Sequence, residues 1–264
     1  MVSRRALLVA FSSAALALGL GAARSAALAE ESIVLGLASP GPLADPIYEA
    51  VAEAKDQGLN VKVIEFTDWV TPNVAVASGD IQHIPFLNDA NAAKGTNLVS
   101  IGVGTSSKLG LYSKKYKSFA EIPDGATVAI ANDPVNSGRG LVLLERAGLI
   151  KLKPGLDYKA TELDITDNPK HLKIVEVVAQ QLPRALDDVD LAEGYAHLLK
   201  AFGVDPHSAL LFDPIQDHYA LQFVVKPGSP KIEQVKKFVH IYQTSPKVRA
   251  ILAEKFGDLI VPAW

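Results

Sequence analysis

The sequence predicts an α/β protein with two lobes, and three observations support this fold class. Segments with strand periodicity alternate with segments of helical periodicity along most of the chain. Residues 32–66 read strand, helix, strand, an order that implies a parallel pair with a right-handed crossover. The length of 264 residues is ample for one large domain or two small ones.

The N-terminal half is expected to contain strands at 32–38, 60–66, 98–103 and 108–112 and helices at 47–55 and 74–77. The first helix places Ile47, Ala50, Val51 and Ala54 on one face and ends at Gly58. Between these elements, Pro85 restricts the residue before it, so residues 81–87 are expected to be extended.

The C-terminal half is expected to contain strands at 126–131 and 219–225 and helices at 140–148, 174–186, 192–202, 230–243 and 246–256. With these boundaries, lobe one comprises residues 32–112 plus 226–264, and lobe two comprises 113–225. Crossings near Tyr112 and Val225 would form a hinge, with a central ligand cleft between the lobes.

Residues 1–29 are predicted to be a secretory signal peptide and not part of the fold. Arg4 and Arg5 precede an apolar run, and the segment closes with Ala27-Leu28-Ala29. Serine and glycine residues dilute the run, so a permanent transmembrane anchor is the weaker interpretation. Cleavage would remove three arginines and no acidic residue, which moves the net charge from −3 to about −6. A mildly acidic chain without charge blocks does not support nucleic-acid binding.

The chain contains no cysteine, which excludes a disulfide framework, a thiolate metal site and a cysteine nucleophile. It also excludes an acyl anchor on an N-terminal cysteine. We therefore expect a free periplasmic protein whose stability depends on its hydrophobic core.

The stretch Asp133 to Arg139 connects a predicted strand to a predicted helix and carries the strongest candidate site. Backbone N–H groups at a helix start favour an anion, and Arg139 adds a planar fork that matches a carboxylate at two points. By itself this pattern favours an ordinary capped helix carrying a surface arginine, and the alternative is a pocket for a small carboxylate.

Other candidate residues are aromatic or imidazole side chains near strand ends. Trp69 follows a predicted strand at its carboxyl end, where ligands of open α/β sheets bind, but it could equally belong to the core. His83 and Phe86 flank Pro85, and no second histidine lies near, so no metal site and no cofactor are predicted.

Four segments in one order resemble the NlpA/MetQ family, the substrate-binding proteins of methionine-type ABC importers. The resemblance extends from about Ile33 to Trp264, and these segments carry it: residues 63–73 (VIEFTDWVTPN), 82–87 (QHIPFL), 133–139 (DPVNSGR) and 181–190 (QLPRALDDVD). It implies a two-lobe type II periplasmic-binding-protein fold. It also implies capture of methionine or a related amino acid or peptide, and delivery to a membrane permease driven by a cytoplasmic ATPase.

The resemblance also implies roles for individual residues. Arg139 would hold the ligand carboxylate, and Asn136 would add a hydrogen bond from the same loop. Trp69, His83 and Phe86 would line the side-chain pocket, where a thioether packs well against aromatic rings. We expect a monomer that binds a small molecule and no nucleic acid.

The sequence departs from the family in three places. The lipobox cysteine is missing, and Ile81 directly precedes Gln82 where members carry several more residues. The segment Leu191 to Tyr195 is also shorter and lacks the asparagine that helps to hold the ligand amino group. Glu193 could accept an ammonium there, or it could be an ordinary solvated loop residue. These departures leave the ligand open, including a non-methionine ligand.

The main competing function is an enzyme acting on a small carboxylate on the same scaffold, because fold does not determine function. Ser137 does not lie in a Gly-x-Ser-x-Gly elbow, and no motif links a histidine to it. Asp187 and Asp188 are adjacent in sequence and are expected to terminate a helix rather than share a proton. We therefore predict a binding protein and not an enzyme.

Overall fold

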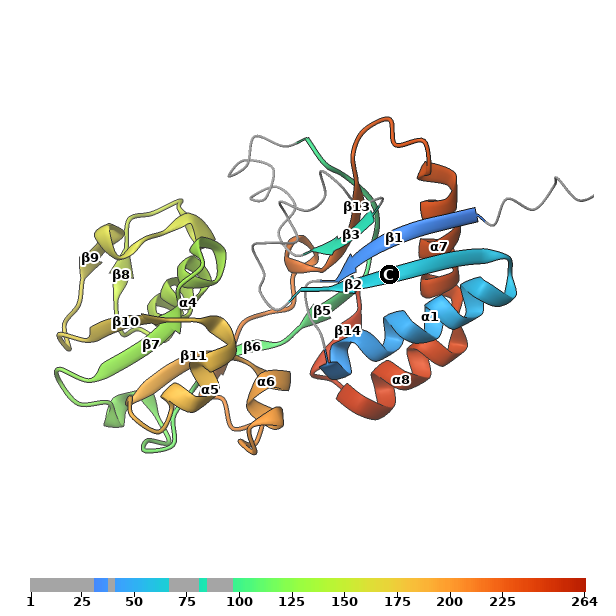
Figure 1. Cartoon of the computed structure of the whole chain (residues 1–264). Coiled ribbons are helices and arrows are strands. Elements are labelled where there is room, and N and C mark those ends of the chain that lie inside the picture. Colours follow the sequence, from blue (N-terminus) through green and yellow to red (C-terminus); the bar gives the residue numbers. More distant parts are fainter. Residues whose placement is uncertain (1–30, 38–40, 67–80, 85–96) are drawn as a thin grey trace, which may run out of the picture.

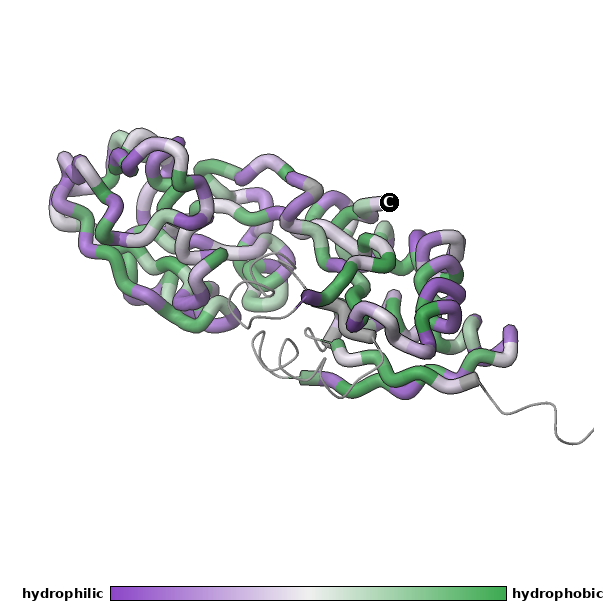
Figure 2. The backbone as a smooth tube through the Cα atoms, turned by 90° about the horizontal axis from the view of Figure 1, so that it is seen from above, coloured by the Kyte–Doolittle hydropathy of each residue, from purple (hydrophilic) through white to green (hydrophobic). Residues whose placement is uncertain are grey.

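The computed structural model describes residues 31–37, 41–66, 81–84 and 97–264. These residues form two α/β lobes that lie side by side in an elongated molecule (Figures 1 and 2). The predicted signal peptide, the predicted helix at 74–77, and Trp69 and Phe86 lie outside the described residues.

The first lobe is built on a five-stranded mixed sheet in the order β2-β1-β3-β13-β4. Its strands are β1 (Glu31–Leu37), β2 (Leu59–Glu65), β3 (Ile81–Ile84), β4 (Val99–Val103) and β13 (Gln222–Val225). β1 pairs in parallel with β2 and β3, whereas β13 runs antiparallel to β3 and β4. The predicted parallel strand–helix–strand unit is therefore confirmed.

Three helices complete the core of the first lobe: α1 (Asp45–Asp56), α7 (Ile232–Thr244) and α8 (Pro246–Phe256). α1 buries Ile47, Ala50 and Ala54, the face that the sequence predicts. These side chains join β1 residues and Phe223 in one hydrophobic cluster. Burying a phenylalanine such as Phe223 contributes about 1.5–3 kcal/mol.

The second lobe has a five-stranded sheet in the order β10-β7-β11-β6-β12. Its strands are β6 (Leu109–Tyr112), β7 (Thr127–Ala131), β10 (Lys173–Val177), β11 (Leu191–Tyr195) and β12 (Leu211–Phe212). β7 pairs in parallel with β10 and β11, and β6 runs antiparallel to β11 and β12. The two sheets therefore share one topology.

The alternation of side chains along β7 divides the core of the second lobe into two layers. Val128 and Ile130 pack with helix α4 (Pro134–Arg146) on one face of the sheet. Ala129 and Ala131 pack on the other face with the region of α5 (Leu182–Ala185) and α6 (Ala196–Ala201). Figure 1 shows α4 and the α5–α6 pair on opposite faces of this sheet.

Smaller elements complete the chain. Two short antiparallel ladders join β5 (Thr105–Ser107) to β14 (Ile260–Pro262) and β8 (Lys151–Leu152) to β9 (Ile165–Asp167). The 3₁₀ helices are η1 (Gly41–Ala44), η2 (Phe119–Glu121), η3 (Asp157–Lys159), η4 (Glu162–Asp164), η5 (Ala179–Gln181) and η6 (Asp217–Tyr219). Within the described ranges, no helix is both long enough and apolar enough to span a bilayer.

The predicted lobe boundaries at Tyr112 and Val225 differ from the membership of the two sheets. β6, which ends at Tyr112, pairs within the second sheet, and β13, which ends at Val225, pairs within the first. The segments between the sheets hydrogen-bond to each other, because the Leu221 N–H donates to the Thr105 carbonyl and the Gly104 N–H donates to the Leu221 carbonyl. The sheet to which β6 or β13 belongs depends on pairing with strands distant in sequence, which local periodicity does not indicate.

Two predicted helices are wrong over part of their length. Residues 173–177 form strand β10 and residues 191–195 form strand β11. The run Lys173-Ile-Val-Glu-Val177 contains three β-branched residues, which favour a strand. Strand β11 lies between β7 and β6 and is buried from Leu191 to Gly194, so tertiary pairing decides its conformation.

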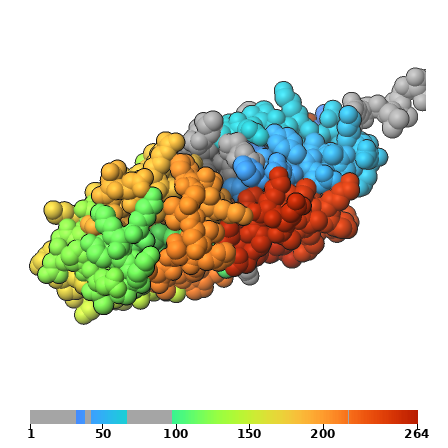
Figure 3. All heavy atoms as spheres, turned by 90° about the horizontal axis from the view of Figure 1, so that it is seen from below, coloured from blue at the N-terminus to red at the C-terminus, as the bar shows by residue number. Residues whose placement is uncertain are grey.

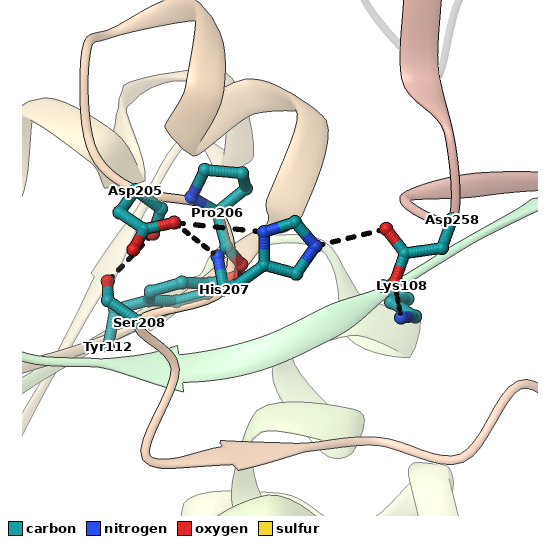
Figure 4. Close-up of polar contacts among 7 residues, drawn as sticks. All are labelled: Lys108, Tyr112, Asp205, Pro206, His207, Ser208 and Asp258. Atoms are coloured by element: carbon teal, nitrogen blue, oxygen red, sulfur yellow. Dashed lines mark hydrogen bonds and ion pairs between the residues drawn. The ribbon is translucent and has the colours of Figure 1, made fainter. Parts of the chain in front are cut away.

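Polar contacts join the two lobes beside the hinge. Asp258, which follows α8, accepts from Lys108 Nζ at 2.5 Å and lies 3.0 Å from His207 Nε2 in the second lobe (Figure 4). Lys200 Nζ in α6 donates to the Lys255 carbonyl in α8 at 3.1 Å. These contacts lie where the C-terminal residues of the first lobe meet the second lobe (Figure 3). Lys108, followed by His207, holds the pKa of Asp258 down, to about 2.

Candidate functional site

Helix α4 begins at Pro134, six residues earlier than the sequence predicts. The side chain of Asp133 caps it by accepting from the Asn136 N–H at 3.1 Å, and Pro134 occupies the first turn. The segment from Asp133 to Arg139 is therefore the N-cap and the first turns of α4. Its proline and serine residues led the sequence analysis to start the helix too late. It starts at the carboxyl end of β7, where open α/β sheets bind ligands.

Arg139 is a buried side chain held by an ion pair within the second lobe. Its Nε and Nη2 donate to Asp213 Oδ2 at 3.2 and 2.8 Å, and its Nη1 donates to the Tyr195 hydroxyl at 3.0 Å. The guanidinium also lies over the Tyr219 ring, 3.8 Å from the centroid. The surface-arginine interpretation is wrong, because only 4% of Arg139 is exposed.

The pairing leaves part of the guanidinium free for a further partner. A guanidinium has five N–H donors, and contacts with described residues engage three of them. Asp213 also accepts from Arg146 Nη1 at 3.2 Å, so one carboxylate faces two arginines. The Asp213 carboxylate therefore links Arg139, near the start of α4, to Arg146 at its end.

Asn136 belongs to the same network but serves mainly as part of the cap. Its Nδ2 donates to both carboxyl oxygens of Asp133, at 3.1 and 2.9 Å. Its Oδ1 accepts from the Tyr195 hydroxyl at 2.8 Å. Asn136 is fully buried. Its polar atoms therefore orient Tyr195, which in turn contacts Arg139.

Glu193 lies in β11, and the interpretation of it as a solvated loop residue is wrong. Only 1% of it is exposed, and its Oε2 accepts from the Ala131 N–H at 3.0 Å. Its Oε1 is buried and has no hydrogen-bond partner among the described residues. Burial raises the pKa of this carboxyl to about 8.

A pocket of about 780 Å³ opens on the other side of the first turn of α4, at the ends of β7 and β10. Its lining includes Ser137, Tyr158, Glu162 and Glu176. Ser137 Oγ donates to Glu176 Oε1 at 3.3 Å and so has a carboxylate, not a histidine, as its partner. Burial and the charge of Glu176 raise the pKa of Glu162. Among the described residues, no group of three or more metal-ligating side chains could hold a metal ion.

The structure brings two of the five predicted site residues together, Arg139 and Asn136. His83 lies in β3 of the first lobe, where only its backbone is described, and Trp69 and Phe86 lie outside the described residues. Whether these three line one pocket with Arg139 stays a prediction.

Residues 33–264 match the model of a family described as NlpA lipoprotein. The chain belongs to the NlpA lipoprotein family. It is 41% identical over 226 residues to the D-methionine-binding lipoprotein MetQ of Salmonella typhi, with 83% of each chain covered. It is 40% identical over 220 residues to the protein of the same name from Escherichia coli K12, covering 80% of this chain and 81% of that one.

Solved structures confirm the fold of this NlpA-family protein. A nutrient-binding protein from Burkholderia cenocepacia bound to methionine superposes with a TM-score of 0.78 at 37% identity, covering 88% of this chain and all of that one. The methionine-binding protein MetQ superposes with a TM-score of 0.79 at 36% identity, covering 88% and 98%. The predicted two-lobe fold of a periplasmic binding protein is therefore confirmed.

Three residues that contact Arg139 were missed by the sequence analysis: Asp213, Tyr195 and Tyr219. Asp213 is 74 residues from its partner Arg139, and Tyr195 is 56 residues from it. The one local signal was the position of Asp213, directly after a short apolar run and before Pro214. That signal is typical of a turn and does not indicate an ion pair.

Proposed function

We propose that the protein is the substrate-binding component of an ABC importer, which captures methionine or a related amino acid between its lobes and delivers it to a permease. Membership of the NlpA family and the binding proteins among its relatives support this function. The observation that carries it is the buried guanidinium of Arg139, which Asp213 fixes and which keeps two N–H donors unused by the described residues.

The geometry suits recognition of a carboxylate. Asp213 binds the guanidinium through Nε and Nη2, which fixes its plane before any ligand arrives. The remaining N–H groups can then form charge-assisted bonds, each contributing roughly 1.5–3 kcal/mol. The Tyr219 ring, in the segment between β12 and β13, lies over one face of the guanidinium and leaves the in-plane N–H groups at its edge. This segment connects the two sheets, so ligand binding and hinge motion would be coupled.

The side chain of the ligand would pack against Trp69, His83 and Phe86 of the first lobe, as the family resemblance implies. A flexible thioether makes favourable contacts with aromatic rings, which fits methionine. The partner would be a membrane permease with a cytoplasmic ATPase, and the binding protein would act as a monomer without a cofactor.

We propose that the chain is exported to the periplasm by residues 1–29. Its relatives are named lipoproteins, whereas this chain has no cysteine to carry an acyl group. A soluble periplasmic form is therefore proposed. In a cell fractionation, the mature protein should be recovered in the periplasmic extract, and recovery in the membrane fraction would contradict this proposal.

The proposed function excludes catalysis. The candidate nucleophile Ser137 donates a hydrogen bond to Glu176. Hydrolases of the Ser–His type instead use a histidine as the base that activates the serine. Turnover of a methionine ester or dipeptide that is lost in Ser137→Ala would contradict this conclusion.

A thermal-shift titration of the mature protein tests ligand binding. A ligand at 100-fold its dissociation constant should add about 2.7 kcal/mol of stability, which raises the midpoint by several degrees. We expect this shift with L- or D-methionine for the wild type and for Arg184→Lys, an exposed control in the same lobe. Arg139→Lys keeps the charge facing Asp213 but loses the planar fork, so the shift should disappear. No shift with any amino acid, from folded wild type, would overturn the proposal.

A further inference from the structure

Two contacts cross from the second lobe to the C-terminal end of helix α8 in the first lobe. Lys200 Nζ, in the last turn of α6, donates to the Lys255 carbonyl at 3.1 Å. His207 Nε2 lies 3.0 Å from Oδ1 of Asp258, which stands two residues beyond the end of α8 (Figure 4). Neither contact belongs to the candidate site at the start of α4.

The charges on the two sides of this contact are complementary. The carbonyl groups at the end of a helix carry partial negative charge, and Asp258 adds a full one. Lys108, followed by His207, lowers the pKa of Asp258 to about 2, so this carboxylate is charged at neutral pH. Asp205, in the same loop as His207, lies 3.7 Å from the other ring nitrogen. The imidazole therefore lies between one carboxylate of each lobe.

The loop that carries His207 is fixed to the second lobe. The Tyr112 hydroxyl donates to the Pro206 carbonyl at 2.8 Å, and Ser208 Oγ donates to the Asp205 carbonyl at 2.7 Å. Tyr112 itself is buried in the hydrophobic cluster on the α6 face of the second sheet. His207 therefore moves with the second lobe, so its contact with Asp258 depends on how the two lobes are oriented.

Lys108 lies at the pivot between the lobes, because its main chain is bonded to both of them. Its N–H donates to the Leu259 carbonyl at 2.9 Å, and its carbonyl accepts from the Ala196 N–H at 3.0 Å. The candidate site lies on α4, which packs on one face of the second sheet, and α6 packs on the opposite face (Figure 1). A rotation about Lys108 that brings the start of α4 toward the first lobe therefore carries α6 and His207 away from α8.

We propose that Lys200 and His207 form a latch on the end of α8 that opposes closure of the lobes over a ligand. The latch keeps the free protein in the open arrangement, and closure requires both contacts to break. The effect on ligand affinity rests on the proposed function, whereas the effect on the arrangement of the lobes does not. Because both contacts are exposed, we expect the latch to change the open-to-closed ratio by about two- to fivefold.

Double electron–electron resonance between spin labels on the two lobes measures this ratio without a ligand. Because the chain contains no cysteine, His240→Cys in α7 and Lys117→Cys in the second lobe supply two exposed label positions. In the labelled mature protein, Asp258→Asn and Lys200→Met should each increase the population of the closed distance about two- to fivefold. Glu233→Gln removes an exposed ion pair inside the first lobe and, as the matched control, should leave the distances unchanged.

A double-mutant cycle tests the pair that crosses between the lobes. Asp258→Asn also removes the contact with Lys108, so its effect alone does not assign a role to His207. Asp258→Asn combined with His207→Ala should shift the open-to-closed ratio by less than the product of the two single changes. Salt at about 1 M screens exposed charges, so it should shift the wild type toward the closed distance more than it shifts the combined variant.

Isothermal titration calorimetry with L-methionine connects the latch to binding. Asp258→Asn and Lys200→Met should bind L-methionine about two- to fivefold more tightly than the wild type, and Glu233→Gln should bind it with unchanged affinity. The substituted side chains are exposed, and circular dichroism confirms that each variant is folded. Weaker binding by the latch variants would overturn the conclusion that the latch opposes closure.

The outcomes separate this inference from the proposed function. Identical distance distributions in the wild type and both latch variants would overturn the latch, even where methionine binds. No binding of methionine to folded wild type, together with shifted distances in the variants, would overturn the proposed function and leave the latch intact.

Discussion

Replacing Asp213 by asparagine tests the ion pair that fixes the candidate site. Asp213 accepts two bonds from Arg139 and one from Arg146, and 4% of the Arg139 side chain and 7% of the Asp213 side chain are exposed. Removing one partner of a buried pair costs about 3–5 kcal/mol, because the other charge stays buried without compensation. Asparagine keeps one oxygen acceptor, so we expect about 3 kcal/mol. For a chain of this size that loss lowers the melting midpoint by about 6–12 °C.

Differential scanning calorimetry of the mature protein is the appropriate assay. Tryptophan fluorescence is unsuitable, because Trp264 packs against the core of the first lobe, whereas Asp213 pairs within the second. Two-lobe proteins do not always unfold in one transition, and calorimetry resolves a transition that belongs to one lobe. Asp167→Asn is the matched control, since its pair with Lys151 is exposed and should contribute 0.5 kcal/mol or less.

A double-mutant cycle adds a test of the pairing itself. Arg139→Met combined with Asp213→Asn should destabilise by less than the sum of the single changes, with a coupling of about 1–3 kcal/mol. A midpoint for Asp213→Asn within a degree of the control, or additive single changes, would refute the conclusion that this pair holds the guanidinium.

Two further predictions concern the second lobe. Burial lowers the pKa of His197 to about 4, below its unfolded value near 6.5, so the unfolded chain binds more protons and stability falls as pH drops through this window. His197→Phe should remove up to about 3 kcal/mol of that pH dependence, seen in melting midpoints at pH 4.5 and 7; an unchanged difference would contradict it. Gly138→Ala places a Cβ 1.7 Å from the Tyr158 carbonyl oxygen and should destabilise by 3 kcal/mol or more, whereas the adjacent Ser137→Ala should cost about 1 kcal/mol in the same melts. Equal melting midpoints for the two variants would contradict this prediction and show that the Tyr158 backbone moves aside with little loss of stability.

The elements predicted correctly are those whose signals are local. The first lobe's β1-α1-β2 unit follows from a short apolar run, a helical stripe and an alternating run, and all three lie in one stretch of chain. The helix predicted at residues 174–177 was wrong, because over so few positions the apolar residues fit a helix and a strand equally well. Neighbouring strand β7 decides between them by supplying the parallel partner.

The candidate site shows the same division. Arg139 and Asn136 were identified because they stand between a strand and a helix in a pattern that resembles a known family. Their environment was not predictable: Arg139 was expected at the surface or in an open pocket, and it is buried against Asp213. Glu193 was left between two interpretations, and burial in β11 removes the solvated one.

The sequence by itself determined the α/β class, the family and the residues at the start of α4, because hydrophobic periodicity, helix capping and short motifs are properties of neighbouring residues. Only the tertiary structure decided which strands pair in each lobe, that Asp213 pairs with Arg139, and that Glu193 is buried in the second lobe with one oxygen unpaired among the described residues. The Arg139–Asp213 pair joins side chains 74 residues apart, and β13 pairs with β3 across 138 residues at Gln222 and Ile84. Their energies arise from burial and long-range pairing, which exist only once both sheets have formed.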